Sequence, residues 1–443
     1  MFNRNSFFRE NLAVGFLLFA LFLGAGNIIF PPELGQQAGE NIVISIIGFL
    51  ITGVGLPLLA IVVVAKNGGD LQILANRVGY KFSLIFTSIV YLAIGPLFAL
   101  PRTGAVSYSI GVAPHLTGNA QDSWFPLFLT TLVFFSITIY LAYNPSKMVD
   151  RIGKVLTPAL LIVISLLAVK AFMTPMGDVG EAKGGYATNA FGEGFVQGYL
   201  TMDVLGALVF GIVIVQALQA RGVTERKEQV KISIFAGVIA AIGLAFVYIS
   251  LAYIGVTSPD ATGYLEDGGA ILAASSEVLY GQLGSIILSA TILLACLTTA
   301  VGLLSANAAF FAKVFPKVSY QAFLIIFTLF SFGVANFGLE NLITISLPVL
   351  LIIYPIAIVL MILALVGDIF KHSKFVYSFA LIVTTFISLY DGIKQAGFEI
   401  PAYESILKTL PLYEQSIGWL IPTIIAAVIG YIVQIIYNSS RAK

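Results

Sequence analysis

Charged residues and cysteine are both scarce in this chain. Of its 443 residues, 10% are charged and 58% are hydrophobic, whereas a soluble domain carries roughly 25% charge, so a soluble globular protein is excluded. The single cysteine, Cys296, excludes an internal disulfide. The formal net charge of +1 gives no sign of a nucleic-acid partner. The composition predicts a protein whose partner is the lipid bilayer, and no segment indicates an obligate protein partner.

Apolar runs of about 20 residues, the length that crosses a bilayer, recur along the whole chain. We predict twelve spans, at 12–32, 42–65, 82–112, 124–143, 155–174, 198–219, 232–256, 284–312, 320–337, 342–366, 375–394 and 416–437. None of the connections is long enough for a separate soluble domain. The expected fold class is therefore an all-α polytopic membrane protein.

The distribution of lysine and arginine predicts the orientation. With the N-terminus inside, the cytoplasmic connections hold 18 of the 23 lysine and arginine residues, as expected because these residues resist translocation. An even number of spans then places both termini in the cytoplasm.

The first span is interrupted in its middle by Gly24-Ala25-Gly26-Asn27, and Pro31 and Pro32 follow. Backbone at this depth must satisfy its own hydrogen bonds unless it faces protein or a cavity, so the pattern predicts a broken helix. Transporters bind their cargo at such breaks. The alternative is that the glycines serve only close helix packing.

The sixth span also carries glycines in its middle, at Gly206 and Gly211. Two interrupted spans in corresponding positions predict an inverted repeat, with halves at 12–174 and 198–366 and with 375–437 outside them. Close packing is again the alternative for these two glycines.

Two adjacent threonines, Thr298 and Thr299, lie in the apolar eighth span, with Ala295 about one turn before them. They can direct two hydroxyl oxygens toward a neighbouring helix, and hard cations prefer oxygen ligands. Together with carbonyls freed by the break near Leu23, they predict a sodium site. The alternative is that each threonine bonds back to its own helix one turn earlier.

These features together resemble a known family. The stretch from Phe19 to Pro32, followed by Gly35 and Ala38-Gly39, is similar to the opening signature of the BrnQ-type branched-chain amino acid:cation symporters of the amino acid-polyamine-organocation superfamily. Further similar motifs are Gly95-Pro96, the stretch from Ala99 to Thr103, and Tyr143-Asn144-Pro145. The resemblance covers residues 12 to about 435.

This resemblance implies a LeuT-type fold of five plus five inverted spans and two more, with helices 1 and 6 broken. It implies import of leucine, isoleucine and valine with a cation across a bacterial cytoplasmic membrane. The implied sodium ligands are the backbone oxygens of Ala20, Leu23 and Ala295 and the hydroxyls of Thr298 and Thr299. The predicted substrate residues are Gly24, Ala25, Gly26, Asn27, Gly206, Ala207, Val209 and Phe210, with Ile94 and Leu97 as further wall candidates.

An amino acid zwitterion brings two charges into a low-dielectric site, and each needs a partner. We expect free N–H groups of the half-helix starting near Gly26 to hold the carboxylate. Carbonyls at the breaks, around Ala20 to Leu23 and Gly206 to Val209, are expected to hold the ammonium. Because one methylene is worth only about 1–3 kcal/mol, overlapping branched-chain specificity is predicted.

Two charged residues within spans are candidates for gates. Arg102 either gates the outer mouth, braces the third span or snorkels to the interface. Asp203 is a proton carrier, a gate partner or a plain acid at a helix start. No span carries the acids and histidines of a proton relay, so sodium is favoured, and a proton-coupled carrier of another neutral amino acid is the alternative. No Cys/His cluster or Ser/His/Asp set indicates an enzyme.

Overall fold

The computed structural model describes residues 4–116, 123–144, 157–265 and 267–441. Every regular element among them is helical. The α-helices are α1 (Arg4–Phe22), α2 (Ala25–Ala38), α3 (Ile42–Leu50), α4 (Leu56–Lys66), α5 (Leu71–Ala75), α6 (Tyr80–Leu92), α7 (Ala99–Gly111), α8 (Trp124–Ala142), α9 (Thr157–Met173), α10 (Gly185–Thr188), α11 (Ala190–Leu200), α12 (Asp203–Gln219), α13 (Arg226–Thr257), α14 (Pro259–Thr262), α15 (Gly268–Tyr280), α16 (Gln282–Val314), α17 (Tyr320–Ala335), α18 (Leu339–Leu365), α19 (Lys374–Gln395), α20 (Pro401–Leu407) and α21 (Leu420–Arg441).

Within the described residues, nine helical stretches are long and apolar enough to cross a membrane. The predicted first, fifth and ninth spans correspond to shorter apolar stretches, Asn11–Phe22, Leu161–Met173 and Tyr320–Ala335. The expectation of an all-helical, multi-pass architecture is therefore confirmed, whereas the count of twelve spans stays a prediction. The start of the predicted fifth span and Pro145 lie outside the described residues.

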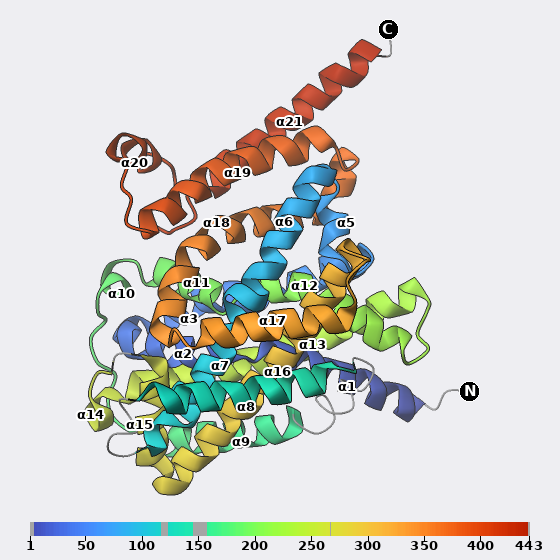
Figure 1. Cartoon of the computed structure of the whole chain (residues 1–443). Helices are drawn as coiled ribbons and strands as arrows, with labels where there is room; N and C mark the ends of the chain where they lie inside the picture. The colour runs from blue at the N-terminus through green and yellow to red at the C-terminus, as the bar shows by residue number, and fades with distance from the viewer. Residues whose placement is uncertain (1–3, 117–122, 145–156, 266, 442–443) are drawn as a thin grey trace.

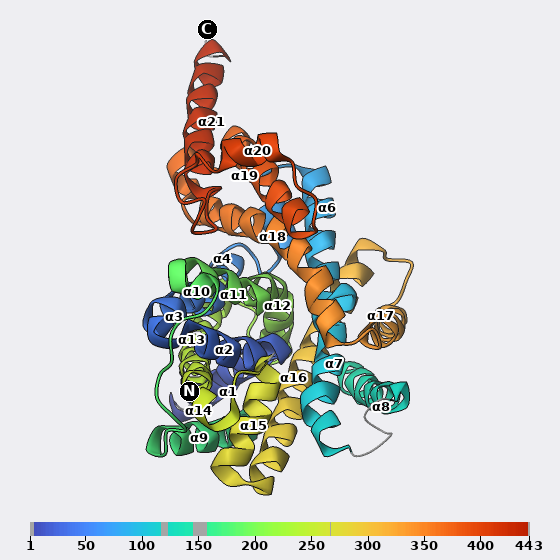
Figure 2. The same ribbon diagram turned by 90° about the vertical axis from the view of Figure 1, so that its left-hand side faces the viewer.

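Several helices, among them α8 and α17, run roughly horizontally in Figure 1 and are seen nearly end-on in Figure 2, whereas α6 stands steeply in both views. α13 packs on α1, α2 and α4, while α16 packs on α1, α7 and α12. α18 leaves the core and meets α19, which pairs with α21 at the top of both views. Pro348 and Pro355 interrupt the hydrogen-bond ladder of α18, which accounts for its bend in Figure 1.

The break in the first span lies where the sequence predicts it. α1 ends at Phe22 and α2 begins at Ala25, and Gly24 between them is extended, with φ −111° and ψ −161°. Pro31 and Pro32 lie inside α2 and supply no N–H to its ladder. The first half of this span therefore stops inside the protein.

The predicted break at Gly206 and Gly211 is wrong, because α12 runs unbroken from Asp203 to Gln219. The sixth span breaks earlier, at Met202, whose left-handed φ of 64° and ψ of 15° cannot continue a helix. Gly211 instead packs closely against Val64 and Gly69. The packing alternative therefore accounts for Gly211, and the break comes from a residue with no glycine-like signature.

The third span is also discontinuous, which the sequence analysis did not predict. A π-helical segment, Ala93–Leu97, joins α6 to α7, and Gly95 within it is non-helical with ψ −123°. Pro96 removes a backbone donor at this point. The interruption ends one turn before Arg102. The backbone N–H of Arg102 donates to the Phe98 carbonyl at 3.1 Å.

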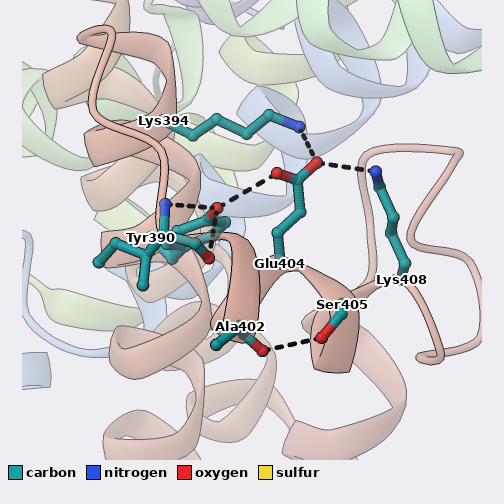
Figure 3. Close-up of polar contacts among 7 residues, drawn as sticks. Tyr390, Lys394, Ala402, Glu404, Ser405 and Lys408 are labelled. Carbon is teal, nitrogen blue, oxygen red and sulfur yellow. Dashed lines mark hydrogen bonds and ion pairs between the residues drawn. The ribbon is translucent and has the colours of Figure 1, made fainter.

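A polar cluster joins α20 to the end of α19 (Figure 3). The Lys394 Nζ atom lies 2.8 Å from Glu404 Oε1, and Lys408 Nζ lies 3.0 Å from the same oxygen. One carboxylate thereby ties the last turn of α19 to the short helix that follows it.

Candidate functional site

A small cavity lies where the two broken spans meet. The volume that the centres of water-sized spheres can occupy in it is about 30 Å³, which is room for about two water molecules. Its walls come from both breaks and from α7 and α16: Leu21, Phe22, Gly24, Ala25, Gly26, Asn27, Ile94, Ala99, Arg102, Thr103, Thr201, Met202, Asp203, Gly206, Phe210, Thr299 and Leu303. A substrate of the size of leucine enters only if these walls move.

Two glycines let the backbone segments approach this closely. A Cβ on Gly26 would lie 3.1 Å from the Leu200 carbonyl oxygen and 3.2 Å from Thr201 Cα. A Cβ on Gly24 would lie 2.9 Å from Thr299 Cγ2. Gly26 therefore brings the two breaks together, and Gly24 brings the first break against α16.

Most of the predicted substrate residues line the cavity. Seven do so: Gly24, Ala25, Gly26, Asn27, Ile94, Gly206 and Phe210. Ala207 and Val209 are buried but are not among the lining residues, because Gly206 and Phe210 share one face of α12 and their neighbours turn away. Leu97 is 36% exposed and lies outside the cavity wall.

The expectation that carbonyls around Gly206 to Val209 hold an ammonium group is not supported, because they lie inside the continuous helix α12. Interior carbonyls of a helix are occupied by its own ladder. The freed carbonyls of the sixth span belong to the last turn of α11, where Leu200 accepts from Arg102.

Three buried polar side chains form a network at the edge of the cavity. Asn27 Nδ2 donates to Asp203 Oδ2 at 2.6 Å, and the Tyr248 hydroxyl donates to the same oxygen at 2.5 Å. Asn27 also contacts the Tyr248 hydroxyl, and its Oδ1 accepts from the Gly24 N–H at 3.2 Å. The network links α2, α12 and α13. Tyr248 is one of 19 tyrosines and has no motif around it, so its place here does not follow from the sequence.

Asp203 lies at the break itself. It is the first residue of α12, is 3% exposed and lines the cavity. The expectation of an acid at a helix start is therefore met, and α11 precedes Asp203 in the same span. Its carboxylate stands at a helix N-terminus, where the dipole favours a negative charge.

Arg102 is buried, at 3% exposure, so it does not snorkel to the interface. Its Nη2 donates to the Leu200 carbonyl at 2.9 Å, and its guanidinium carbon lies 5.5 Å from the centre of the Phe30 ring. Nε and Nη1 have no hydrogen-bond partner. Arg102 and Asp203 thus place opposite charges on the walls of one cavity.

Four of the five predicted sodium ligands lie together between α1 and α16. The Thr298 hydroxyl is 3.0 Å from the Ala20 carbonyl oxygen and 2.9 Å from that of Ala295, and the Thr299 hydroxyl is 3.2 Å from the Ala20 oxygen. Leu23, the fifth, is buried in the break itself. Thr298 bonds back to its own helix as the alternative expects, but both threonines also reach across to α1. This set of neutral oxygens fits a hard monovalent cation.

The fold and the cavity define a multi-pass membrane transporter built around discontinuous helices. Residues 8–437 match the family described as branched-chain amino acid transport protein. The chain belongs to this family.

Named relatives agree with this assignment. The chain is 49% identical to the branched-chain amino acid permease BraB of Bacillus subtilis, covering 98% of this chain and 97% of the relative. It is 46% identical to the branched-chain amino acid transport system 2 carrier protein of Pseudomonas aeruginosa, over 95% of this chain and 95% of the relative. It is 43% identical to the branched-chain amino acid permease BrnQ of Escherichia coli, over 96% of this chain and 95% of the relative. These relatives are transporters and not enzymes.

A solved structure shares the fold. Mhp1, a nucleobase-cation-symport-1 family transporter, matches with a TM-score of 0.57 over 92% of this chain and 95% of its own. The sequence identity is 16%, so the likeness concerns the fold alone.

Proposed function

We propose that this chain is a secondary symporter that imports leucine, isoleucine and valine together with sodium across a bacterial cytoplasmic membrane. The names of the relatives support the substrate class. The apolar part of the cavity wall suits an aliphatic side chain: the Phe22 and Phe210 rings lie edge to face with centroids 5.7 Å apart, and Leu21, Ile94 and Leu303 complete this side.

One observation carries the proposal: Thr299 belongs to the cavity wall and to the oxygen cluster at once. Its side chain lines the cavity, and its hydroxyl contacts the Ala20 carbonyl of the first half-helix. A cation held there bridges α1 and α16 and stabilises the wall that the substrate contacts. Such a shared wall couples the two binding free energies.

Alternating access in this protein then uses a LeuT-type arrangement of five plus five spans. The halves are 12–174 and 198–366, each opening with a broken helix, and 375–437 follow as two additional spans of twelve. The fold likeness to Mhp1 supports this arrangement. The lysine and arginine distribution supports cytoplasmic termini.

The test is uptake of labelled leucine by proteoliposomes under an imposed sodium gradient or an imposed proton gradient. We expect sodium to drive uptake, and isoleucine and valine to compete. Thr298→Ala combined with Thr299→Ala removes two of the proposed oxygen ligands and is expected to abolish stimulation by sodium. Thr291→Ala is the matched control, because its hydroxyl donates only within α16, to the Ile287 carbonyl at 2.7 Å. Unchanged sodium stimulation in the double variant refutes the assigned cation site.

Proton coupling is the second candidate, and the buried Asp203 carboxylate in the cavity favours it. Uptake driven by a proton gradient alone would move the coupling to this residue. If leucine is also a poor substrate, the protein is instead assigned as a proton-coupled carrier of another neutral amino acid.

A further inference from the structure

Three N–H groups of Arg102 have no partner in the protein interior. Nε and Nη1 together carry three of the five donors of a guanidinium, and neither has a hydrogen-bond partner. An unsatisfied buried donor on a charged group is costly. A residue kept in this state on a cavity wall indicates that a ligand completes its hydrogen bonds.

The hydrogen bond that Arg102 does make fixes its position. Nη2 donates to the Leu200 carbonyl at the end of α11, 2.9 Å away, and the guanidinium lies over Phe30 of α2. These two contacts hold the guanidinium between the two breaks. The rest of its planar fork stays free, and such a fork matches the paired oxygens of a carboxylate or a phosphate.

Asp203 supplies the complementary charge. Asn27 and Tyr248 both donate to its Oδ2, which holds the carboxylate at the start of α12 on the wall of the same cavity. A substrate with a carboxylate and an ammonium on one carbon brings a partner for each of these residues. An apolar molecule or a simple cation would leave the guanidinium unsatisfied.

Resting on the proposed function, we propose that Arg102 binds the α-carboxylate of the substrate and that Asp203 receives its α-ammonium group. The site therefore selects α-amino acids by their head group and leaves the side chain to the apolar wall. The first residues of α2 line the same cavity, and the free N–H groups of a helix N-terminus are suited to assist Arg102 with the carboxylate.

The experiment measures equilibrium binding to the purified full-length protein in sodium buffer. The probes are leucine, leucinol, which lacks the carboxylate, and 4-methylpentanoate, which lacks the ammonium. Loss of a charge-assisted hydrogen bond to a carboxylate corresponds to about a 10- to 100-fold rise in Kd. We expect the wild-type protein to bind leucine at least that much more tightly than leucinol.

Arg102→Gln is expected to raise the Kd of leucine by the same factor while the Kd of leucinol changes little. Arg102→Lys keeps the charge but not the fork, and is expected to restore part of the difference between the two ligands. Asp203→Asn should weaken leucine and leucinol but spare 4-methylpentanoate. Arg226→Gln is the matched control, because this arginine is exposed, donates to the Lys66 carbonyl and is not among the residues that line the cavity.

Two outcomes overturn the inference. Equal binding of leucine and leucinol by the wild-type protein refutes it without any variant. A parallel loss of both ligands in Arg102→Gln means that Arg102 only braces α11. If the wild-type protein binds none of leucine, isoleucine and valine, the proposed function fails instead, so the two failures are distinguishable.

Discussion

Replacing Gly24 by alanine places one methyl group against the proposed cation site. The added Cβ would lie 2.9 Å from Thr299 Cγ2, 3.0 Å from its Oγ1 and 3.1 Å from its Cβ. Rotation of the threonine side chain does not relieve this crowding, because its Cβ is itself too close and β-branched side chains are stiff at χ1. Either α16 or the break must therefore shift by a few tenths of an ångström.

The size of the effect follows from the place of Thr299. Its hydroxyl lies 3.2 Å from the Ala20 carbonyl oxygen, so a shift separates two of the proposed ligands. Extra methylenes in packed interiors cost about 1–3 kcal/mol. If most of this cost falls on the bound state, half-saturating sodium for leucine uptake rises about 5- to 150-fold.

The assay is the sodium dependence of leucine uptake in proteoliposomes, with the amount of inserted protein measured in parallel. Gly333→Ala is the matched control, because this glycine of α17 has nothing within 4 Å of an added Cβ. The control should leave the sodium dependence unchanged and slightly stabilise its helix. A Gly24→Ala protein with wild-type sodium dependence would show that Gly24 and Thr299 do not form one site, and the reasoning would fail.

Two further predictions concern polar networks. Tyr248→Phe removes a hydrogen-bond donor to the buried Asp203 carboxylate. We expect the free energy of unfolding to fall by about 1–3 kcal/mol and leucine binding to weaken. An unchanged unfolding temperature would show that the hydroxyl is dispensable. Hydrogen bonds from Lys394 and Lys408 lower the pKa of Glu404 from 4.5 to about 2. The stabilising contribution of the ionised Glu404 carboxylate is therefore present above pH 4.5 and is lost as the pH falls toward 2. Glu404→Gln should flatten the dependence of the unfolding temperature on pH in this range. An unaltered slope would contradict the assignment.

The first break was predictable because its signal is local. Gly24 and Gly26 disfavour a helix through backbone freedom, and Pro31 and Pro32 remove donors, so the sequence itself disfavours a continuous helix. The threonine pair was predictable for a similar reason, since two hydroxyls on adjacent residues of an apolar helix need a partner. The structure brings both threonines to the Ala20 carbonyl.

The sixth break was not predictable from local signals. Its left-handed residue is Met202, which has no intrinsic preference for that conformation, so tertiary packing imposes it at a cost of about 1–2 kcal/mol. Gly211, which suggested a break in the wrong place, serves instead to let α12 approach α4. Glycine in a membrane helix marks close approach at least as often as a break.

The partners of Asp203 were also beyond the sequence, because Asn27, Asp203 and Tyr248 are separated by 176 and 45 residues and meet only through the fold. Arg102 was recognised as unusual, but its depth depends on the kink at Gly95, which moves α7 off the line of α6. Charge within an apolar span drew attention to Arg102 and Asp203, which the structure places on one cavity wall, and the fold alone fixed their neighbours.

In the proposed binding mode, the two buried charges also connect the chemistry of the substrate to the transport cycle. Because the cavity here has room for only about two water molecules, the unpaired donors of Arg102 favour a more open conformation, in which more water can complete its hydrogen bonds. If the zwitterion binds as proposed, it supplies Arg102 and Asp203 with partners of opposite charge at short range and offsets that preference. Closure around the substrate then becomes more favourable than closure around an empty site. Under this proposal, coupling between occupancy and closure needs no separate sensor, because the residues proposed to recognise the head group are the residues whose burial is unfavourable without it.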